Sequence, residues 1–149
     1  MDGRSFLKAM ERGDVAPPAV AEVLGMRLKA VGENWVEFTM TAQTHMLNLL
    51  GTLHGGALAV LVDSALTGAV ITQLPKGKAC TSLDFQIRFF RPVRPSGDVL
   101  TARGTLVNLG RTVAATEASV TNGAGKIVAH ATSSLAILDA QDLMRERRA

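Results

Sequence analysis

The chain has 149 residues, of which 47% are apolar and 19% charged, which is the composition of an ordinary globular domain with its own core. Its net charge is +3, but much of the surplus lies in a C-terminal tail with Arg145, Arg147 and Arg148, which is typical of a solvated end. One Trp, five Phe and no Tyr are too few aromatics for a nucleic-acid surface, so we expect no nucleic-acid partner. A phosphorylated small molecule suits the scattered arginines better.

The chain also lacks features of membrane, secreted and metal-binding proteins. Its longest apolar stretch is interrupted by Asp63, Ser64 and Thr67 and has no flanking basic residues, which argues against a membrane span. The first residues mix both charge signs without the apolar run of a signal peptide, so we expect a cytoplasmic location. The single cysteine, Cys80, and three histidines without ligand spacing predict no disulfide, no metal and no cofactor. For Cys80, a small buried hydrophobe is the favoured interpretation and a nucleophile the alternative.

The first half of the chain predicts short helices, a hairpin and one long helix. Within an N-terminal helical segment, 1–25, short helices are expected over 5–12 and from the proline pair at 17–18 to Gly25, both as packing elements without chemistry. Alternating apolar and polar residues predict a hairpin of 26–31 and 35–41. A central helix follows over 54–73.

The second half predicts strands. Alternation begins after Pro75 and Gly77 and is clearest from Leu83 to Phe89, and further strands are expected over 99–109, 112–121 and 126–138. The charged tail, 139–149, is expected to be a frayed or exposed helix. The whole chain, 1–149, is therefore predicted to be one α+β domain, with a long antiparallel sheet wrapped around one helix.

The central helix carries a carboxylate, Asp63, among side chains so apolar that we expect protein to cover the helix nearly all round. An ionised carboxylate there is costly unless it is hydrogen-bonded or paired. The Gly55-Gly56 pair favours a tight turn that leaves the first N–H groups of the helix pointing outward, where they can hold an oxyanion. The alternative is that Asp63 only hydrogen-bonds a neighbouring backbone group or Thr67.

Gly55 and Asp63 are too far apart to serve one small group within one chain. A helix rises about 1.5 Å per residue, so the eight positions between them correspond to roughly 12 Å along the axis. If both act on one substrate, a second copy of the helix running the opposite way must complete the site, as a two-fold dimer provides.

The spacing of Asn48, His54-Gly55-Gly56, Asp63 and Ser82, the last within TSLDFQIRFFRP, resembles the PaaI-like branch of the hotdog-fold acyl-CoA thioesterases, the 4HBT superfamily. The resemblance covers nearly everything over 23–138. It implies a long curved antiparallel sheet around a central helix, and acyl-CoA as substrate. It also implies a homodimer whose sheets join edge to edge, often paired into a tetramer, with active sites at the dimer interface.

The resemblance also implies roles for single residues. Asp63 is expected to be the general base or nucleophile, and the Gly55 N–H to polarise the thioester carbonyl. Asn48 and His54 would orient water or support the oxyanion hole. His54 could instead only close the turn by a side-chain hydrogen bond, and Asn48 could be only a turn residue or helix cap.

Other residues are candidates for holding water or substrate. Ser82 resembles a hydroxyl that holds the attacking water in some members, and Thr67 a threonine with similar work in a neighbouring branch. Gly56 is expected beside the substrate, where its backbone geometry suits an oxyanion hole. Candidate contacts to the CoA phosphates are Arg88, Arg91 and Arg111. An apolar acyl pocket is expected from Met46, Leu47, Leu49 and Leu50 with the apolar helix face, for a medium-length chain or an aryl group such as phenylacetyl.

The expected function is therefore hydrolysis of an acyl-CoA thioester, with water activated by Asp63 and the carbonyl bound at Gly55 of a second chain. A thiolate is a stable leaving group near neutral pH, so a single carboxylate with an oxyanion hole can suffice. The alternatives are a hotdog dehydratase acting on hydroxyacyl thioesters and a non-catalytic acyl-CoA sensor.

Overall fold

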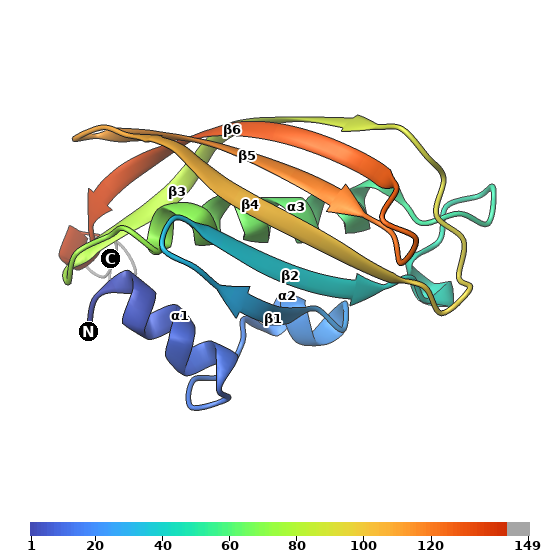
Figure 1. Ribbon diagram of the computed structural model, residues 1–149, viewed down its shortest axis with the longest axis horizontal. Helices are drawn as coiled ribbons and strands as arrows, with labels where there is room; N and C mark the ends of the chain where they lie inside the picture. The colour runs from blue at the N-terminus through green and yellow to red at the C-terminus, as the bar shows by residue number, and fades with distance from the viewer. Residues whose placement is uncertain (143–149) are drawn as a thin grey trace.

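The computed structural model describes residues 1–142 and has an antiparallel sheet curved around one long helix (Figure 1). The elements in chain order are α1 (Gly3–Glu11), α2 (Ala19–Val23), β1 (Arg27–Val31), β2 (Trp35–Thr41), the short 3-10 helix η1 (Thr44–Met46), α3 (Gly55–Ile71), β3 (Lys78–Phe89), β4 (Val99–Leu109), β5 (Val113–Thr121) and β6 (Ile127–Asp139). The strand order is β1-β2-β4-β5-β6-β3, with all neighbours antiparallel. The predicted α+β architecture is confirmed.

The strand β3 begins at Lys78, directly after Gly77, as the sequence predicts, and it pairs with β6 from Lys78 opposite Asp139 onward. A helical turn begins at Ala140. Most of the predicted tail helix, 143–149, lies outside the described residues.

The core lies between α3 and the concave face of the sheet. In β2 the buried side chains of Val36, Phe38 and Met40 alternate with outward-facing residues, as the sequence pattern predicts. They pack with fully buried α3 residues such as Leu61 and Leu66. None of the helices in the described chain is long and apolar enough to cross a membrane.

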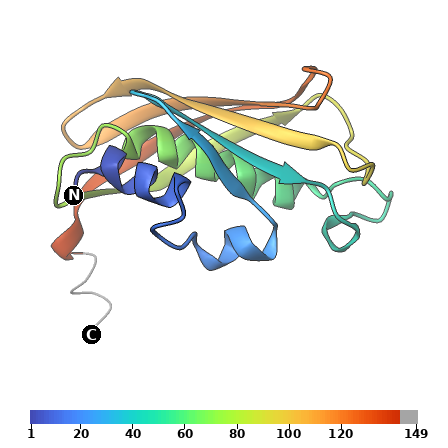
Figure 2. The same ribbon diagram turned by 60° about the horizontal axis from the view of Figure 1, so that its bottom comes forward.

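One side of α3 stays partly exposed, so the expectation that protein covers this helix nearly all round is wrong for the single chain. Asp63, Ser64 and Thr67 on this side are half-buried. The helix α1 packs against α3 and β1, and both short helices lie on the open side of the sheet with α3 (Figures 1 and 2). An apolar sequence indicates that a helix is buried by protein, but it does not indicate whether the same chain or a second chain buries it.

The strand β3 forms one edge of the sheet. It has 12 residues and pairs only with β6 among the described strands. Several large apolar side chains along it remain exposed, with 59% of Leu83, 37% of Phe85 and 51% of Phe89 accessible. This edge therefore combines unpaired backbone groups with uncovered apolar surface.

Candidate active site

The carboxylate of Asp63 has a hydrogen-bond partner on the sheet. Ser82 lies on β3, and its Oγ donates to Asp63 Oδ1 over 2.7 Å in a half-buried setting. The partner is neither Thr67 nor a neighbouring backbone group, the two alternatives left open by the sequence. One carboxylate oxygen is thus engaged by Ser82, while no hydrogen bond to Oδ2 is found within residues 1–142.

Cys80 lies two residues before Ser82, and its Sγ is 3.9 Å from the carbonyl oxygen of Thr67 in α3. Burial, together with the negative charge of Asp63, raises the pKa of the Cys80 thiol to about 11. A thiol held protonated at neutral pH is a poor nucleophile, which favours the packing interpretation. The described chain has no group of three or more His, Cys, Asp or Glu side chains placed to hold a metal ion.

The start of α3 is organised by His54. Its Nδ1 accepts the N–H of Gly56 over 2.9 Å, and its carbonyl oxygen accepts the N–H groups of Ala57 and Leu58. The turn-closing role considered for His54 is therefore observed. The N–H of Gly55 has no acceptor within residues 1–142, so it remains available at the positive end of the helix.

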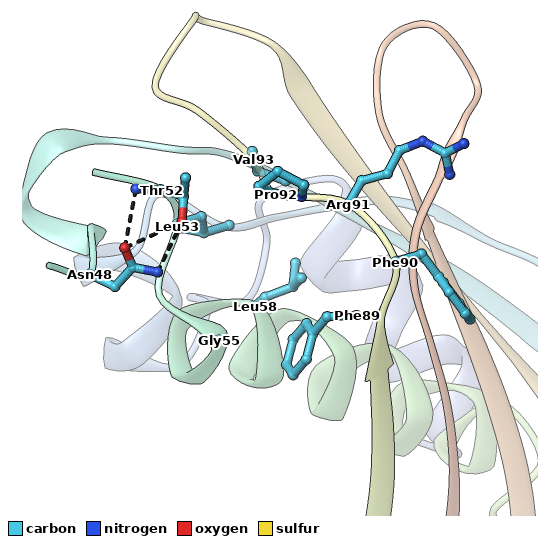
Figure 3. A pocket seen from close by; sticks show the side chains of 10 residues that line it. All are labelled: Asn48, Thr52, Leu53, Gly55, Leu58, Phe89, Phe90, Arg91, Pro92 and Val93. Carbon is cyan, nitrogen blue, oxygen red and sulfur yellow. Dashed lines mark hydrogen bonds between the residues drawn. The ribbon is translucent and has the colours of Figure 1, made fainter. Parts of the chain in front are cut away.

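Asn48 holds the loop before α3. Its Nδ2 donates to Thr52 Oγ1 over 2.9 Å, and its Oδ1 accepts the N–H of Thr52 (Figure 3). The same Oδ1 also accepts the N–H of Leu50. The amide thus fixes the loop conformation and also lines a cavity of about 340 Å³ beside Gly55. The Phe89 ring borders the same cavity, and its Cζ would lie 3.1 Å from a Cβ placed on Gly55. A side chain at position 55 would narrow this space.

Three cavities surround α3, and the candidate residues are divided among them. Gly55 and Asn48 line the first. His54 and Gly56 line the second, of about 420 Å³. Asp63 and Thr67 line the third, of about 410 Å³. Within one chain, Gly55 and Asp63 thus open into different cavities, in keeping with the roughly 12 Å between them along the helix.

The three candidate phosphate-binding arginines do not gather at one place. Arg91 borders the cavity of Gly55, but its side chain extends away from Asn48 and its Nη1 donates to the carbonyl oxygen of Ile127 over 2.8 Å (Figure 3). Arg88 follows Ile87, which packs against the core, so alternation places Arg88 on the outer face of the sheet.

Arg111 lies in the turn between β4 and β5, at the other end of the sheet from Arg88. The next strand residue, Val113, pairs with Ala136, and Ala136 in turn pairs with Thr81 near the start of β3. Phe89 beside Gly55 lies at the opposite end of β3. A single chain therefore does not bring Arg111 to Gly55.

Two of the four residues expected to form an apolar pocket, Met46 and Leu47, line one cavity in the single chain together with Ala57 and Val60 of α3. Leu49 and Leu50 are exposed, at 106% and 84%, on the loop that Asn48 holds. Met46 is buried in the core with 4% exposure. Leu47 lines the cavity of His54.

Residues of the N-terminal segment line part of the cavity that contains Asp63. The sequence predicts only a packing role for this segment. Its lining includes Phe6 and Met10 of α1 and the proline pair at 17–18. The apolar face of α1 could not reveal this, because a face that lines a cavity has the same periodicity as one packed in a core.

Comparison with known proteins places this chain in one class of proteins. The sequence pattern of the thioesterase superfamily matches residues 50–129, which include Gly55, Asp63 and Ser82 but not Asn48. The chain therefore belongs to the thioesterase superfamily. The acyl-coenzyme A thioesterase PaaI of Escherichia coli is 32% identical over 111 residues, 74% of this chain and 76% of that protein. Human acyl-coenzyme A thioesterase 13 is 34% identical over 91 residues, 60% of this chain and 64% of that protein.

The solved structures confirm the hotdog fold. The structure of the E. coli PaaI protein from the phenylacetic acid degradation operon matches with a TM-score of 0.80 and 27% identity, over 91% of this chain and 95% of that one. Matches to the first curated relatives span 60% to 64% of the relatives' own lengths.

Proposed function

We propose that the protein hydrolyses acyl-CoA thioesters. The observation that carries this proposal is the hydrogen bond from Ser82 to Asp63 on the helix that begins at Gly55. A carboxylate with one oxygen held and one free is suited to act as a general base. Membership of the thioesterase superfamily and the names of relatives such as PaaI support the same activity.

In the proposed reaction, Oδ2 of Asp63 accepts a proton from water as the water oxygen bonds to the thioester carbonyl carbon. The N–H of Gly55 donates to the carbonyl oxygen as negative charge develops there. The tetrahedral intermediate then collapses, the carbon–sulfur bond breaks, and the proton held by Asp63 returns to the CoA thiolate. Ser82 positions the carboxylate and, beside it, the water.

The proposed site combines Gly55 of one chain with Asp63 of another. The separate cavities of the two residues and the length of helix between them support this arrangement. The unpaired edge of β3 is the surface that we propose for joining the two sheets of a homodimer. Two such dimers would give a tetramer, and the proposed location of the enzyme is the cytoplasm.

The proposed acyl group is an aryl group such as phenylacetyl, or a medium-length chain. E. coli PaaI comes from the phenylacetic acid degradation operon, so phenylacetyl-CoA is the first substrate to test. Octanoyl-CoA represents the medium-length alternative.

The experiment that tests the proposal measures free thiol released from a panel of acyl-CoA thioesters, with the Asp63→Asn protein as the matched control. Thiol release by the wild type and its loss in the variant are expected. A dehydratase would convert a hydroxyacyl-CoA without releasing thiol, and a sensor would bind acyl-CoA with no turnover. Either result would contradict the proposed hydrolysis.

A further inference from the structure

We propose that the cavity between the N-terminal helices and α3 receives the acyl group, and that Met10 and Phe6 of α1 determine which acyl groups fit. This inference rests on the proposed thioesterase function, which it deepens by assigning the acyl subsite. The sequence pattern of the superfamily matches from residue 50 onward, so it does not include the α1 residues that line this cavity.

The cavity has the composition of an acyl site. Its volume of about 410 Å³ falls within the usual range for small-molecule sites. Among residues 1–142, Asp63 is the only charged residue in its lining, and Ser64, also there, already donates its hydroxyl to the Val60 carbonyl oxygen. A hydrocarbon group could therefore lie along apolar walls with its reactive end toward the carboxylate. The cavity at Gly55 instead includes Asn48, Thr52 and Arg91, a more polar lining.

Two of the three α1 residues that line this cavity keep accessible surface. Phe6 keeps 39% of its surface exposed and Met10 is half-buried, whereas the third, Leu7, is 3% exposed and belongs to the core. A methionine has three rotatable bonds, so it can adjust to ligands of different shape. The two side chains thus offer apolar surface that a ligand can cover.

The helix α1, which forms this side of the cavity, is held in a fixed position. The N–H of Gly3 donates to the carbonyl oxygen of Leu74 over 2.9 Å, just beyond the end of α3. A Cβ at Gly3 would collide with the carbonyl oxygen of Ile71, so the close approach requires glycine. Asp2 caps α1 by accepting the N–H of Ser5 over 2.8 Å. Because α1 is anchored in this way, it can limit the length of the ligand instead of moving to admit a longer one.

The test compares three variants of α1. Met10→Ala enlarges the cavity, Met10→Trp fills it, and Arg4→Ala is the control, since Arg4 is exposed on the same helix and does not line the cavity. The kcat/KM is measured for butyryl-, hexanoyl-, octanoyl-, decanoyl- and dodecanoyl-CoA. In the wild type it should rise about fourfold for each methylene buried, until the cavity is full. The preferred chain should lengthen in Met10→Ala, shorten in Met10→Trp and stay unchanged in Arg4→Ala.

A second measurement separates this inference from the proposed function. Calorimetric titration with S-butyl-, S-octyl- and S-dodecyl-CoA, which are thioethers and cannot be hydrolysed, reports chain-length preference without turnover. If no thioester is cleaved but the thioether preference shifts with Met10, the proposed hydrolysis fails and the acyl subsite stands. If both Met10 variants fold, as judged by Tm, and keep the wild-type chain-length profile in both measurements, the inference is overturned. Lack of any dependence on chain length overturns it equally.

Discussion

Gly104 of β4 lies directly against the backbone of Ala65 in α3, so closely that a Cβ on Gly104 would collide with the Ala65 carbonyl oxygen. Ala65 is two residues from Asp63. The absence of a side chain at position 104 therefore fixes how deeply α3 sits in the sheet. It also contributes to the distance at which Asp63 meets Ser82.

We expect Gly104→Ala to lower the free energy of unfolding by about 1 to 3 kcal/mol, because backbone must move to admit the methyl group. Urea denaturation measures this loss. Thr105→Ala, on the outward face of the same strand, is the control and should cost less than about 1 kcal/mol. Equal effects of the two substitutions would show that the helix can shift at little cost.

Asp63→Asn should lower kcat by at least about a hundredfold while leaving KM similar, because the amide removes the base but keeps the shape of the side chain. The asparagine oxygen can still accept the Ser82 hydroxyl, so the fold should be retained. Steady-state kinetics and a thermal unfolding curve together check this expectation. Turnover near the wild-type rate would rule out Asp63 as the base.

A mixed dimer tests whether two chains share each site. Asp63→Asn and Asn48→Ala are each expected to inactivate a homodimer. Co-expressed with two different tags, they should form heterodimers in which one site carries both defects and the other none. Such heterodimers should recover roughly half the wild-type activity, as two-fold symmetry requires. Inactive heterodimers from two folded, dimerising parents would contradict either the shared site or the role of Asn48.

Arg91 and Arg111 can be tested separately as contacts of the CoA phosphates. If Arg91 contacts a CoA phosphate, Arg91→Gln should raise KM for acyl-CoA and weaken its salt dependence, yet leave an acyl-pantetheine thioester nearly unaffected. Arg111→Gln, measured in the same way, tests whether Arg111 of the second chain makes this contact instead. Equal effects of Arg91→Gln on both substrates would assign Arg91 a structural role through its bond to the Ile127 carbonyl oxygen.

Cys80 should resist alkylation in the folded protein. Burial raises its pKa from an ordinary 9.0 to about 11, so near neutral pH the thiolate is about a hundredfold scarcer than in the unfolded chain. Iodoacetamide labelling followed by mass spectrometry, with and without urea, measures the difference. Because the folded thiol keeps a proton that the unfolded one loses, its contribution to stability is complete below pH 9 and is lost as pH rises through about 11.

The sequence predicts the strands and α3 well where side chains alternate or repeat strongly. The register shift in β3 between Ser82 and Asp84 escapes prediction, because pairing with β6 and not side-chain alternation decides where it falls. The resemblance to the thioesterases correctly indicates that Asp63 and Ser82 meet, although their roles stay predictions. The position of Met10 in the lining of the Asp63 cavity could not be predicted from the sequence, because it depends on how α1 packs on α3.

The unpaired edge of β3 makes the single chain prone to unwanted strand pairing. A long strand with free backbone groups and exposed Leu83 and Phe89 is a template for unwanted cross-β pairing and aggregation. The charged residues Lys78, Asp84 and Arg88 interrupt its apolar surface and act as gatekeepers. Substitutions that remove these charges should therefore reduce soluble yield in the cell more than they reduce the stability of the folded chain.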